Sequence, residues 1–330
     1  MSALLEVENL RVEIATRRGA LLAIDDVSFS IGRGEILGVV GESGAGKSLT
    51  GTAVLGLLDP PVRLAGGAIR LAGERIDGLG EDALRSFRGR RIGAVFQDPM
   101  TSLNPLLTVG HQLVQTIRTH LDIPADAARE RAASLLAEVG VPAPRERLDT
   151  YPHQLSGGLR QRVVLALAFA CDPELVIADE PTTALDVSVQ AQVIDVLKRM
   201  GRERGASVLL ITHDMGVIAE AADRIAVMYA GRLVEIGPVR SILASPSHPY
   251  TRGLMASIPS MRRRGIDLPQ IEGAMPRLGA IPDGCAFAPR CPERLPRCSR
   301  ERPDLAAGQD SLAACWLVGE NRSTAWRAAS

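Results

Sequence analysis

Aromatic residues are scarce in this chain, and so are lysines. Only 3% of the 330 residues are aromatic, and every basic residue except Lys47 and Lys198 is an arginine. An excess of charge of either sign is also missing, since 38 basic residues stand against 38 acidic ones. This balance argues against a nucleic-acid partner held mainly by counterion release. Because lysine is so rare here, a lysine inside a motif carries more information than usual.

Long apolar runs and a secretory leader are missing as well. Apolar runs such as Val163 to Cys171 fall far short of the roughly 20 residues that cross a hydrocarbon core. The first eight residues contain two glutamates and no basic region, so we predict no signal peptide. The composition, 46% hydrophobic and 23% charged, excludes a disordered chain and suffices for one large core or two smaller ones. We expect a folded, cytoplasmic protein.

The pattern of apolar runs predicts an α/β core. Before residue 36, short apolar runs alternate with turn signals, as in antiparallel strands. Ile36–Val40 is then continuously apolar, which is typical of a strand buried on both faces, and Lys47–Leu58 follows as a helix. Two later apolar runs, Leu175–Ala178 and Val208–Thr212, are separated by helical sequence such as Ser188–Met200. This alternation indicates a parallel sheet with helical crossovers.

Two further regions differ from this core in composition. Residues 100–170 are rich in helix formers, including Asp126–Val139, and predict a helical insert. After Gly237 the chain becomes rich in proline, arginine and cysteine, which predicts a separate, loop-rich C-terminal module. We therefore divide the chain into a domain of residues 1–240 and a C-terminal extension of residues 241–330.

A phosphate-binding motif occupies residues 41–48, which read GESGAGKS. The motif follows the buried strand and begins the helix, which is the context that its mechanism requires. Its glycines allow backbone N–H groups to surround phosphates, Lys47 contributes a charge, and Ser48 offers a hydroxyl to Mg²⁺. A simple glycine turn with an incidental lysine is the alternative, which the full match disfavours. The predicted nucleotide-binding residues are Gly41, Glu42, Ser43, Gly44, Ala45, Gly46, Lys47, Ser48 and Leu49.

A pair of carboxylates ends the run LVIADE at residues 175–180. Asp179 can hold Mg²⁺, and Glu180 can polarise or activate a water molecule that attacks a phosphate. Adjacent carboxylates could instead cap the next helix. The phosphate motif in the same chain favours the catalytic interpretation.

The string LSGGLRQR at residues 155–162 lies between these two motifs and resembles the signature of ATP-binding cassette (ABC) proteins. FQDPMTSLNP at 96–105, YPHQLSGGLRQR at 151–162 and SPSHPYT at 245–251 are similar to ATPase subunits of oligopeptide and dipeptide importers. The resemblance implies a P-loop NTPase fold with a RecA-like core, an antiparallel β subdomain and a helical subdomain. It also implies a small Cys/Pro-rich C-terminal module.

The resemblance further implies a head-to-tail dimer that encloses ATP between two chains. One chain supplies the phosphate loop and the other supplies Ser156, Gly157 and Gly158. These three residues precede an apolar-periodic helix, whose N-terminus is an anion site without a phosphate loop nearby in sequence. The alternative role of Ser156 is that of a helix N-cap.

Four other residues receive roles from the same resemblance. Gln97 is similar to the lid glutamine, which also binds Mg²⁺, and His213 to the switch histidine, although a histidine there could simply be a structural residue after a strand. Asp186 belongs to Ala184-Leu185-Asp186, which resembles the loop joining two protomers. Arg18 occupies the place of the aromatic residue that usually stacks on adenine. Arg18 could stack through its guanidinium plane, with loose base specificity, or remain a solvated surface residue.

Four cysteines lie near the C-terminus: Cys285, Cys291, Cys298 and Cys315. Their spacing has no C-x-x-C pair, which disfavours zinc ribbons, and it leaves a cluster, zinc and free thiols all open. The string GCAFAPRCPERLPRC at 284–298 looks like the cysteine region of peptide-importer ATPases. That resemblance makes one 4Fe-4S cluster, acting as a structural staple, the leading hypothesis.

The implied partners follow from the family. They are two transmembrane permease subunits, a second homologous ATPase in a heterodimer and, indirectly, an extracytoplasmic substrate-binding protein, with no nucleic acid. The chain would lie peripherally at the cytoplasmic face of the membrane and use ATP and Mg²⁺. Two alternatives remain. The cargo could be nickel or glutathione, or the chain could be a soluble ABC ATPase of translation or DNA repair, although those usually carry tandem cassettes or a long coiled coil.

Overall fold

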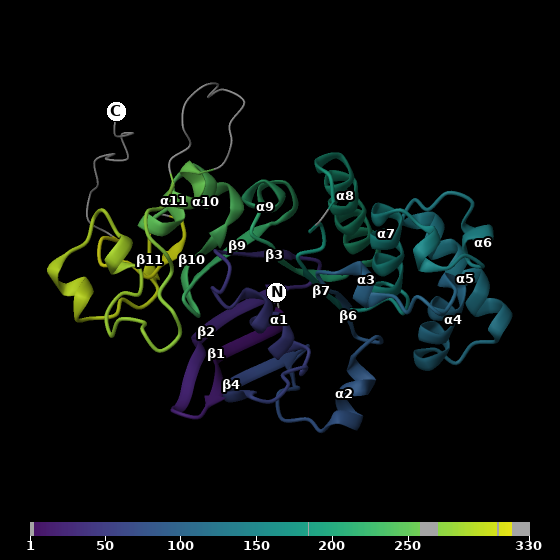
Figure 1. The fold of residues 1–330 in the computed structure, drawn as a ribbon, viewed down its shortest axis with the longest axis horizontal. Helices are drawn as coiled ribbons and strands as arrows, with labels where there is room; N and C mark the ends of the chain where they lie inside the picture. The colour runs from purple at the N-terminus through teal and green to yellow at the C-terminus, as the bar shows by residue number, and fades with distance from the viewer. Residues whose placement is uncertain (1–2, 184, 258–269, 309, 319–330) are drawn as a thin grey trace.

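Two β-sheets organise the computed structural model, which describes residues 3–183, 185–257, 270–308 and 310–318. The main sheet has the strand order β11-β12-β10-β9-β3-β8-β7-β6, and the smaller sheet has the order β2-β1-β4-β5 (Figure 1). The strands are β1 (Ala3–Thr16), β2 (Gly19–Gly32), β3 (Ile36–Val40), β4 (Val62–Leu71), β5 (Glu74–Arg75), β6 (Ile92–Val95), β7 (Leu175–Asp179), β8 (Ser207–Ile211), β9 (Arg224–Tyr229), β10 (Arg232–Pro238), β11 (Ala306–Ala307) and β12 (Leu312–Ala313).

The centre of the main sheet is parallel. Strand β3 pairs with β8 on one side and β9 on the other, and β7 joins β8 to β6, all in parallel. Every residue of β3 and β8 is buried, as their continuous apolar sequences predict for strands covered on both faces. Parallel strands place their carboxyl ends at one edge, so the segments that follow β3, β7 and β8 meet there.

The smaller sheet is antiparallel and packs against the main sheet. We expected separate short strands near the N-terminus, whereas Leu4–Val7 and Val12–Ile14 belong to one 14-residue strand, β1. Register shifts in its pairing with β2 accommodate the irregular apolar spacing. Buried residues of β1 and β2, such as Leu5 and Ile24, share one apolar cluster with Val39 of the main sheet.

The structure has a helix at each of the three predicted ranges, 47–58, 126–139 and 188–200, with ends that differ by up to four residues. The helices are α1 (Lys47–Val54), α2 (Glu81–Phe87), α3 (Pro99–Ser102), α4 (Val109–His120), α5 (Ala125–Glu138), α6 (Pro144–Arg147), α7 (Gly157–Ala168), α8 (Val187–Arg204), α9 (Met215–Ala221), α10 (Val239–Ala244) and α11 (Pro249–Ala256). Helix α1 ends before the predicted Leu58, because Gly56 adopts a left-handed φ of +63°. Arg88 donates to the carbonyls of Leu55 and Gly56 and satisfies this end.

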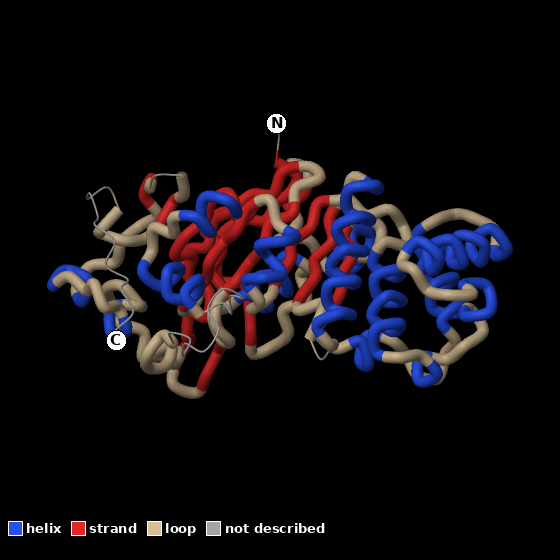
Figure 2. The backbone as a smooth tube through the Cα atoms, turned by 90° about the horizontal axis from the view of Figure 1, so that it is seen from above, coloured by secondary structure: helices blue, strands red, loops and turns tan. Residues whose placement is uncertain are grey.

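Helices α4 to α7 gather at one end of the molecule, away from the smaller sheet (Figures 1 and 2). Apolar residues of α4, α5 and α7, such as Leu113, Leu136 and Val163, share one buried cluster with residues of the main sheet. None of the helices in the described ranges combines the length and apolar character needed to cross a membrane.

The part of the chain after residue 270 contains little regular structure. We call residues 270–308 and 310–318 the C-terminal segment. It contains two short 3₁₀ helices, η2 (Ala288–Arg290) and η3 (Pro296–Ser299), besides β11 and β12. Strand β12 pairs with β10, so this segment continues the main sheet at the end opposite to α4–α7 (Figure 1).

Candidate active site

The phosphate loop connects β3 to α1, as its sequence predicts. Gly41 and Gly46 have φ values of +154° and +101°, which favour glycine. A Cβ at Gly41 would also lie 2.3 Å from the carbonyl oxygen of Met228. The Nζ of Lys47 donates to the carbonyl oxygens of Gly41 at 2.8 Å and Glu42 at 3.2 Å. The backbone carbonyls of the loop therefore hold the side chain of Lys47.

The phosphate loop meets the carboxyl end of β7 through Ser48 and Asp179. The Ser48 hydroxyl donates to Oδ1 of Asp179 at 2.9 Å. Burial raises the pKa of Asp179. Burial also lowers the pKa of Lys47, against the opposing attraction of Glu180, Asp179 and Glu42. The structure thus brings together a hydroxyl and a carboxylate, the hard oxygen ligands that Mg²⁺ prefers.

Glu180 follows β7 and is held in a constrained position. Its φ is +48°, a left-handed conformation that costs energy for a non-glycine residue and is often found at functional sites. Its carboxylate accepts a hydrogen bond from the hydroxyl of Thr183 at 3.1 Å and lies 2.8 Å from Nδ1 of His213. The Glu180 side chain is 11% exposed and that of His213 is 67% exposed. The pair therefore presents an accessible imidazole backed by a nearly buried carboxylate.

A cleft of about 650 Å³ joins these groups, a size suited to a small-molecule ligand. The predicted site residues that line it are Ser43, Gly44, Gly46, Lys47, Ser48, Leu49, Gln97, Glu180 and His213. Ile14, Ala23 and Leu278 also line the cleft, and sequence reasoning did not find them. Ile14 and Ala23 belong to apolar stretches of β1 and β2, and Leu278 lies outside any motif, so nothing in the sequence marks these three as site residues.

The signature residues Ser156, Gly157 and Gly158 are not among the described residues that line this cleft. Ser156 is the N-cap of α7 and accepts a hydrogen bond from the N–H of Leu159. A Cβ on Gly158 would lie 2.6 Å from Val189 of α8, so glycine permits the two helices to approach. Ser156 therefore caps α7, and the predicted contact of these residues with ATP bound to a second chain stays a prediction.

Asp186 and Arg18 also lie outside the described lining of the cleft. Asp186 caps α8 by accepting from the N–H of Val189 at 2.9 Å, while Ala184 of the same loop falls outside the described residues. Arg18 is exposed in the turn between β1 and β2, where its N–H donates to Thr16 Oγ1. Contacts of both residues with nucleotide stay predictions.

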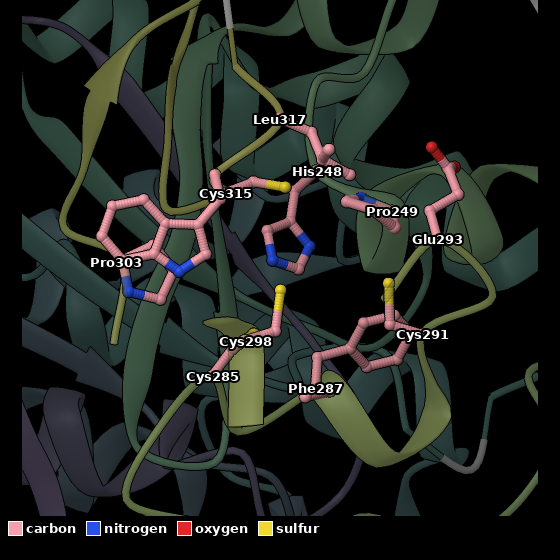
Figure 3. Close-up of a pocket in the computed structure, with 12 residues that line it drawn as sticks. His248, Pro249, Cys285, Phe287, Cys291, Glu293, Cys298, Pro303, Cys315 and Leu317 are labelled. Carbon is pink, nitrogen blue, oxygen red and sulfur yellow. The ribbon is translucent and has the colours of Figure 1, made fainter. Parts of the chain in front are cut away.

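The four C-terminal cysteines line a single pocket (Figure 3). His248, Phe287 and Trp316 are among its other lining residues. Among the described residues there is no group of three or more His, Cys, Asp or Glu that could hold a metal ion. Cys285 N–H donates to the carbonyl of Cys298 at 2.8 Å, and a Cβ on Gly284 would lie 2.3 Å from the same oxygen. Close backbone packing thus brings Cys285 and Cys298 together.

Comparison with protein families matches two parts of the chain. Residues 24–183 match the family described as ABC transporter. Residues 234–298 match the family described as oligopeptide/dipeptide transporter, C-terminal region. The two matches cover the phosphate loop, the signature, the carboxylate pair and three of the four C-terminal cysteines.

Individual relatives and solved structures resemble the chain over most of its length. It is 46% identical to the dipeptide transport ATP-binding protein DppD of Bacillus subtilis, over 96% of this chain and 95% of the relative. It is 44% identical to DppD of Escherichia coli, over 92% and 93%. A dimeric ATP-binding cassette bound to ADP and phosphate is 28% identical, with a TM-score of 0.65, over 72% of this chain and 99% of that one.

Proposed function

The chain belongs to the ABC transporter family of ATP-binding proteins, and we propose that it powers the import of dipeptides or oligopeptides across the cytoplasmic membrane. As the ATPase subunit of a peptide importer, it converts ATP binding and hydrolysis into movement of its partners. One observation carries the assignment of the chemistry: a single cleft joins the phosphate loop, Gln97 and the Glu180–His213 pair.

In this proposal, different residues of the site have different roles in ATP hydrolysis. Lys47 binds the β and γ phosphates, and Ser48, Asp179 and Gln97 hold Mg²⁺, which neutralises the developing charge when bound. Glu180 orients the attacking water and accepts its proton. His213 contacts the γ phosphate, and its hydrogen bond to Glu180 couples the phosphate contact to the base.

A second chain completes the site in this proposal. Ser156, Gly157 and Gly158 begin α7 and present a helix N-terminus to the phosphates of the opposite chain. Asp186 and its loop lie at the contact between the chains. The dimeric state of the ADP-bound relative of this fold supports a role in trans.

We assign the partners from the same family relationship. They are two permease subunits, a second homologous ATPase and a substrate-binding protein, with this chain peripheral to the cytoplasmic face. Affinity purification from gently solubilised native membranes, followed by mass spectrometry, tests this assignment. We expect two permeases and a peptide-binding protein. Recovery of a nickel- or glutathione-binding protein would change the cargo, whereas recovery of ribosomes or repair proteins would overturn the transport role.

We also propose that Cys285, Cys291, Cys298 and Cys315 hold one 4Fe-4S cluster that staples the C-terminal segment into a Cys/Pro-rich module. The support is their shared pocket, which four thiols line together with His248 and Glu293. The lack of a site for one metal ion is compatible, because each thiolate of such a cluster binds a different iron. The segment has little regular structure, so a cluster would compensate for its small core.

Iron and acid-labile sulfide in anaerobically purified full chain test the cluster. We expect four of each per chain, as the cluster's formula requires, and a loss of both in Cys298→Ser. Cys171→Ala is the matched control, because Cys171 is a buried thiol outside the pocket. Wild-type protein that contains neither iron nor sulfide would contradict the proposal.

A further inference from the structure

The second residue of the phosphate loop, Glu42, contacts the C-terminal part of the chain. Its N–H donates to the hydroxyl of Tyr250 at 2.9 Å, and Tyr250 is a fully buried residue of α11. Its carboxylate oxygens lie 2.9 and 3.1 Å from Nη1 of Arg290. Arg290 is 248 residues away in the sequence and directly precedes Cys291. Residues distant in sequence thus hold both the backbone and the side chain of Glu42.

Contacts with residues other than Glu42 also hold the Arg290 guanidinium in place. Its Nε donates to the carbonyl of Glu272 at 2.9 Å and its Nη2 to that of Ile271 at 3.1 Å. Nη1 also donates to the hydroxyl of Tyr229 at 3.3 Å. The side chain is only 6% exposed. A buried guanidinium with carbonyl partners on one edge presents its remaining donor in a fixed direction.

Glu42 transmits this restraint to the phosphate-binding lysine. The carbonyl oxygen of Glu42 accepts from Nζ of Lys47, so a shift of the Glu42 backbone displaces a partner of Lys47. An unpaired Glu42 carboxylate would also attract Lys47 and repel a triphosphate. We propose that Arg290 is a positioning residue for nucleotide binding, which acts through Glu42 to keep the phosphate loop and Lys47 in place.

Equilibrium binding of MgATP to the full chain tests this proposal from both sides of the contact. Arg290→Gln should weaken binding roughly tenfold, since a hydrogen-bonded charge pair is broken. Glu42→Gln should have an effect of its own, and the double variant should cost less than the two single effects combined. Additive effects, or wild-type affinity in both single variants, would overturn the proposal.

One control variant and one variant on the loop side separate positioning from general damage. Arg252→Gln removes a comparable contact, between Arg252 and Glu293 at 2.8 Å, that does not touch the loop, and we expect wild-type affinity. Glu42→Gln tests the contact from the loop side even if Arg290→Gln disturbs the C-terminal segment. In the assembled transporter, Arg290→Gln should raise KM for ATP more than it lowers kcat.

A separate observation concerns the apolar end of the cleft. Ile14 of β1, Ala23 of β2 and Leu278 of the C-terminal segment line the cleft together with the phosphate loop. Leu278 is 41% exposed, a large apolar area to leave open to water. The neighbouring Gly279 lies against Leu21 of β2, which holds this part of the segment beside the smaller sheet.

A nucleotide has a highly charged phosphate end and, at the other end, a flat base whose faces pack against apolar side chains. The phosphate loop accounts for the charged end, and the three apolar residues offer a surface for the other. Arg18, at the expected position of a base-stacking residue, is not among the described residues lining the cleft. We infer that Leu278, with Ile14 and Ala23, forms the surface against which the base of the bound nucleotide packs.

Comparing ligands with and without a base tests this inference. Leu278→Ser should weaken MgATP and MgGTP binding to the full chain by similar factors, roughly three- to tenfold for the loss of apolar contact. Binding of magnesium tripolyphosphate should not change. Leu312→Ser is the matched control, because Leu312 is a 45% exposed leucine that does not line the cleft. Equal weakening of tripolyphosphate, no effect on ATP, or a base-dependent loss in Arg18→Ala instead would overturn the inference.

Discussion

The phosphate loop and the C-terminal segment reach the same cleft in different ways. The loop consists of consecutive residues between β3 and α1, and its shape depends on glycines and on a lysine bonded to its own carbonyls. The C-terminal segment contributes Leu278 to the cleft and Arg290 to the loop residue Glu42, and both are separated from the loop by more than two hundred residues. A locally encoded site can be identified in the sequence, whereas a site completed by a distant segment becomes visible only in the fold.

The two regions also differ in how they are held together. Two large clusters of buried apolar residues come almost entirely from residues 4–250, which we call the cassette, and Phe287 of the C-terminal segment joins one of them. The C-terminal segment is attached in part through polar groups, above all Glu235 of β10, which is fully buried. Its carboxylate accepts from Ser247 N–H at 2.8 Å, His248 N–H at 3.0 Å and the Ser311 hydroxyl at 2.8 Å. One buried carboxylate thus connects β10, the start of α11 and the C-terminal segment.

The largest predicted effect is on ATP hydrolysis, in a variant in which both regions stay folded. Glu180→Gln should lower ATP turnover by about 10²- to 10⁴-fold, the usual contribution of a general base, while MgATP still binds and holds the dimer closed. Lys47→Ala should instead weaken MgATP binding roughly tenfold or more. Turnover, equilibrium binding and the oligomeric state with ATP distinguish the two variants. Rapid turnover by Glu180→Gln would contradict our assignment of the base.

The second prediction breaks the attachment of the C-terminal segment. Glu235→Ala leaves three donors without their acceptor, so we expect the free energy of unfolding to fall by about 3 kcal/mol. In Glu235→Ala, limited proteolysis should cleave the C-terminal segment at an earlier time than it cleaves the cassette. Glu203→Ala is the control, because Glu203 is exposed and should change stability by less than about 0.5 kcal/mol. Equal stability of the two variants would show that Glu235 does not hold the segment.

The sequence predicted the parts of the cassette that short-range patterns determine. The continuous apolar run Ile36–Val40 is β3, and Ser188–Met200 lies within α8. The end of α1 was missed although Gly56, at which the helix stops, is visible in the sequence, whereas the contacts of Arg88 with the carbonyls of Leu55 and Gly56 could not be predicted. Arg290 could not be found, since nearly every basic residue is an arginine and one more gives no signal. Leu278 lies in a proline-rich stretch without helical or strand periodicity, so no pattern indicates which residue faces a ligand.

The smallest predicted effect tests whether the two regions are energetically independent. Asp77, which follows β5, accepts from Ile69 N–H at 2.8 Å and from Arg75. Burial opposes its charged form, but these hydrogen bonds hold the pKa of Asp77 below its ordinary value. Asp77→Asn should therefore cost about 1 kcal/mol at neutral pH, measured by urea unfolding, and Asp59→Asn, an exposed control, should cost almost nothing.

The pH dependence of Asp77 follows from the direction of this shift. The unfolded chain protonates Asp77 near its ordinary pKa of about 3.9, and the folded chain only at lower pH. The stabilisation is therefore complete above that value and is lost as the pH falls through the lower, folded pKa, so wild type and Asp77→Asn should converge in acid. Because Asp77 and Glu235 share no described hydrogen-bond partner, Asp77→Asn should cost the same in the wild-type and Glu235→Ala backgrounds. If the cost of Asp77→Asn depends on the background, the cassette and the C-terminal segment do not fold independently. The two regions would then differ only in whether their site residues can be recognised in the sequence.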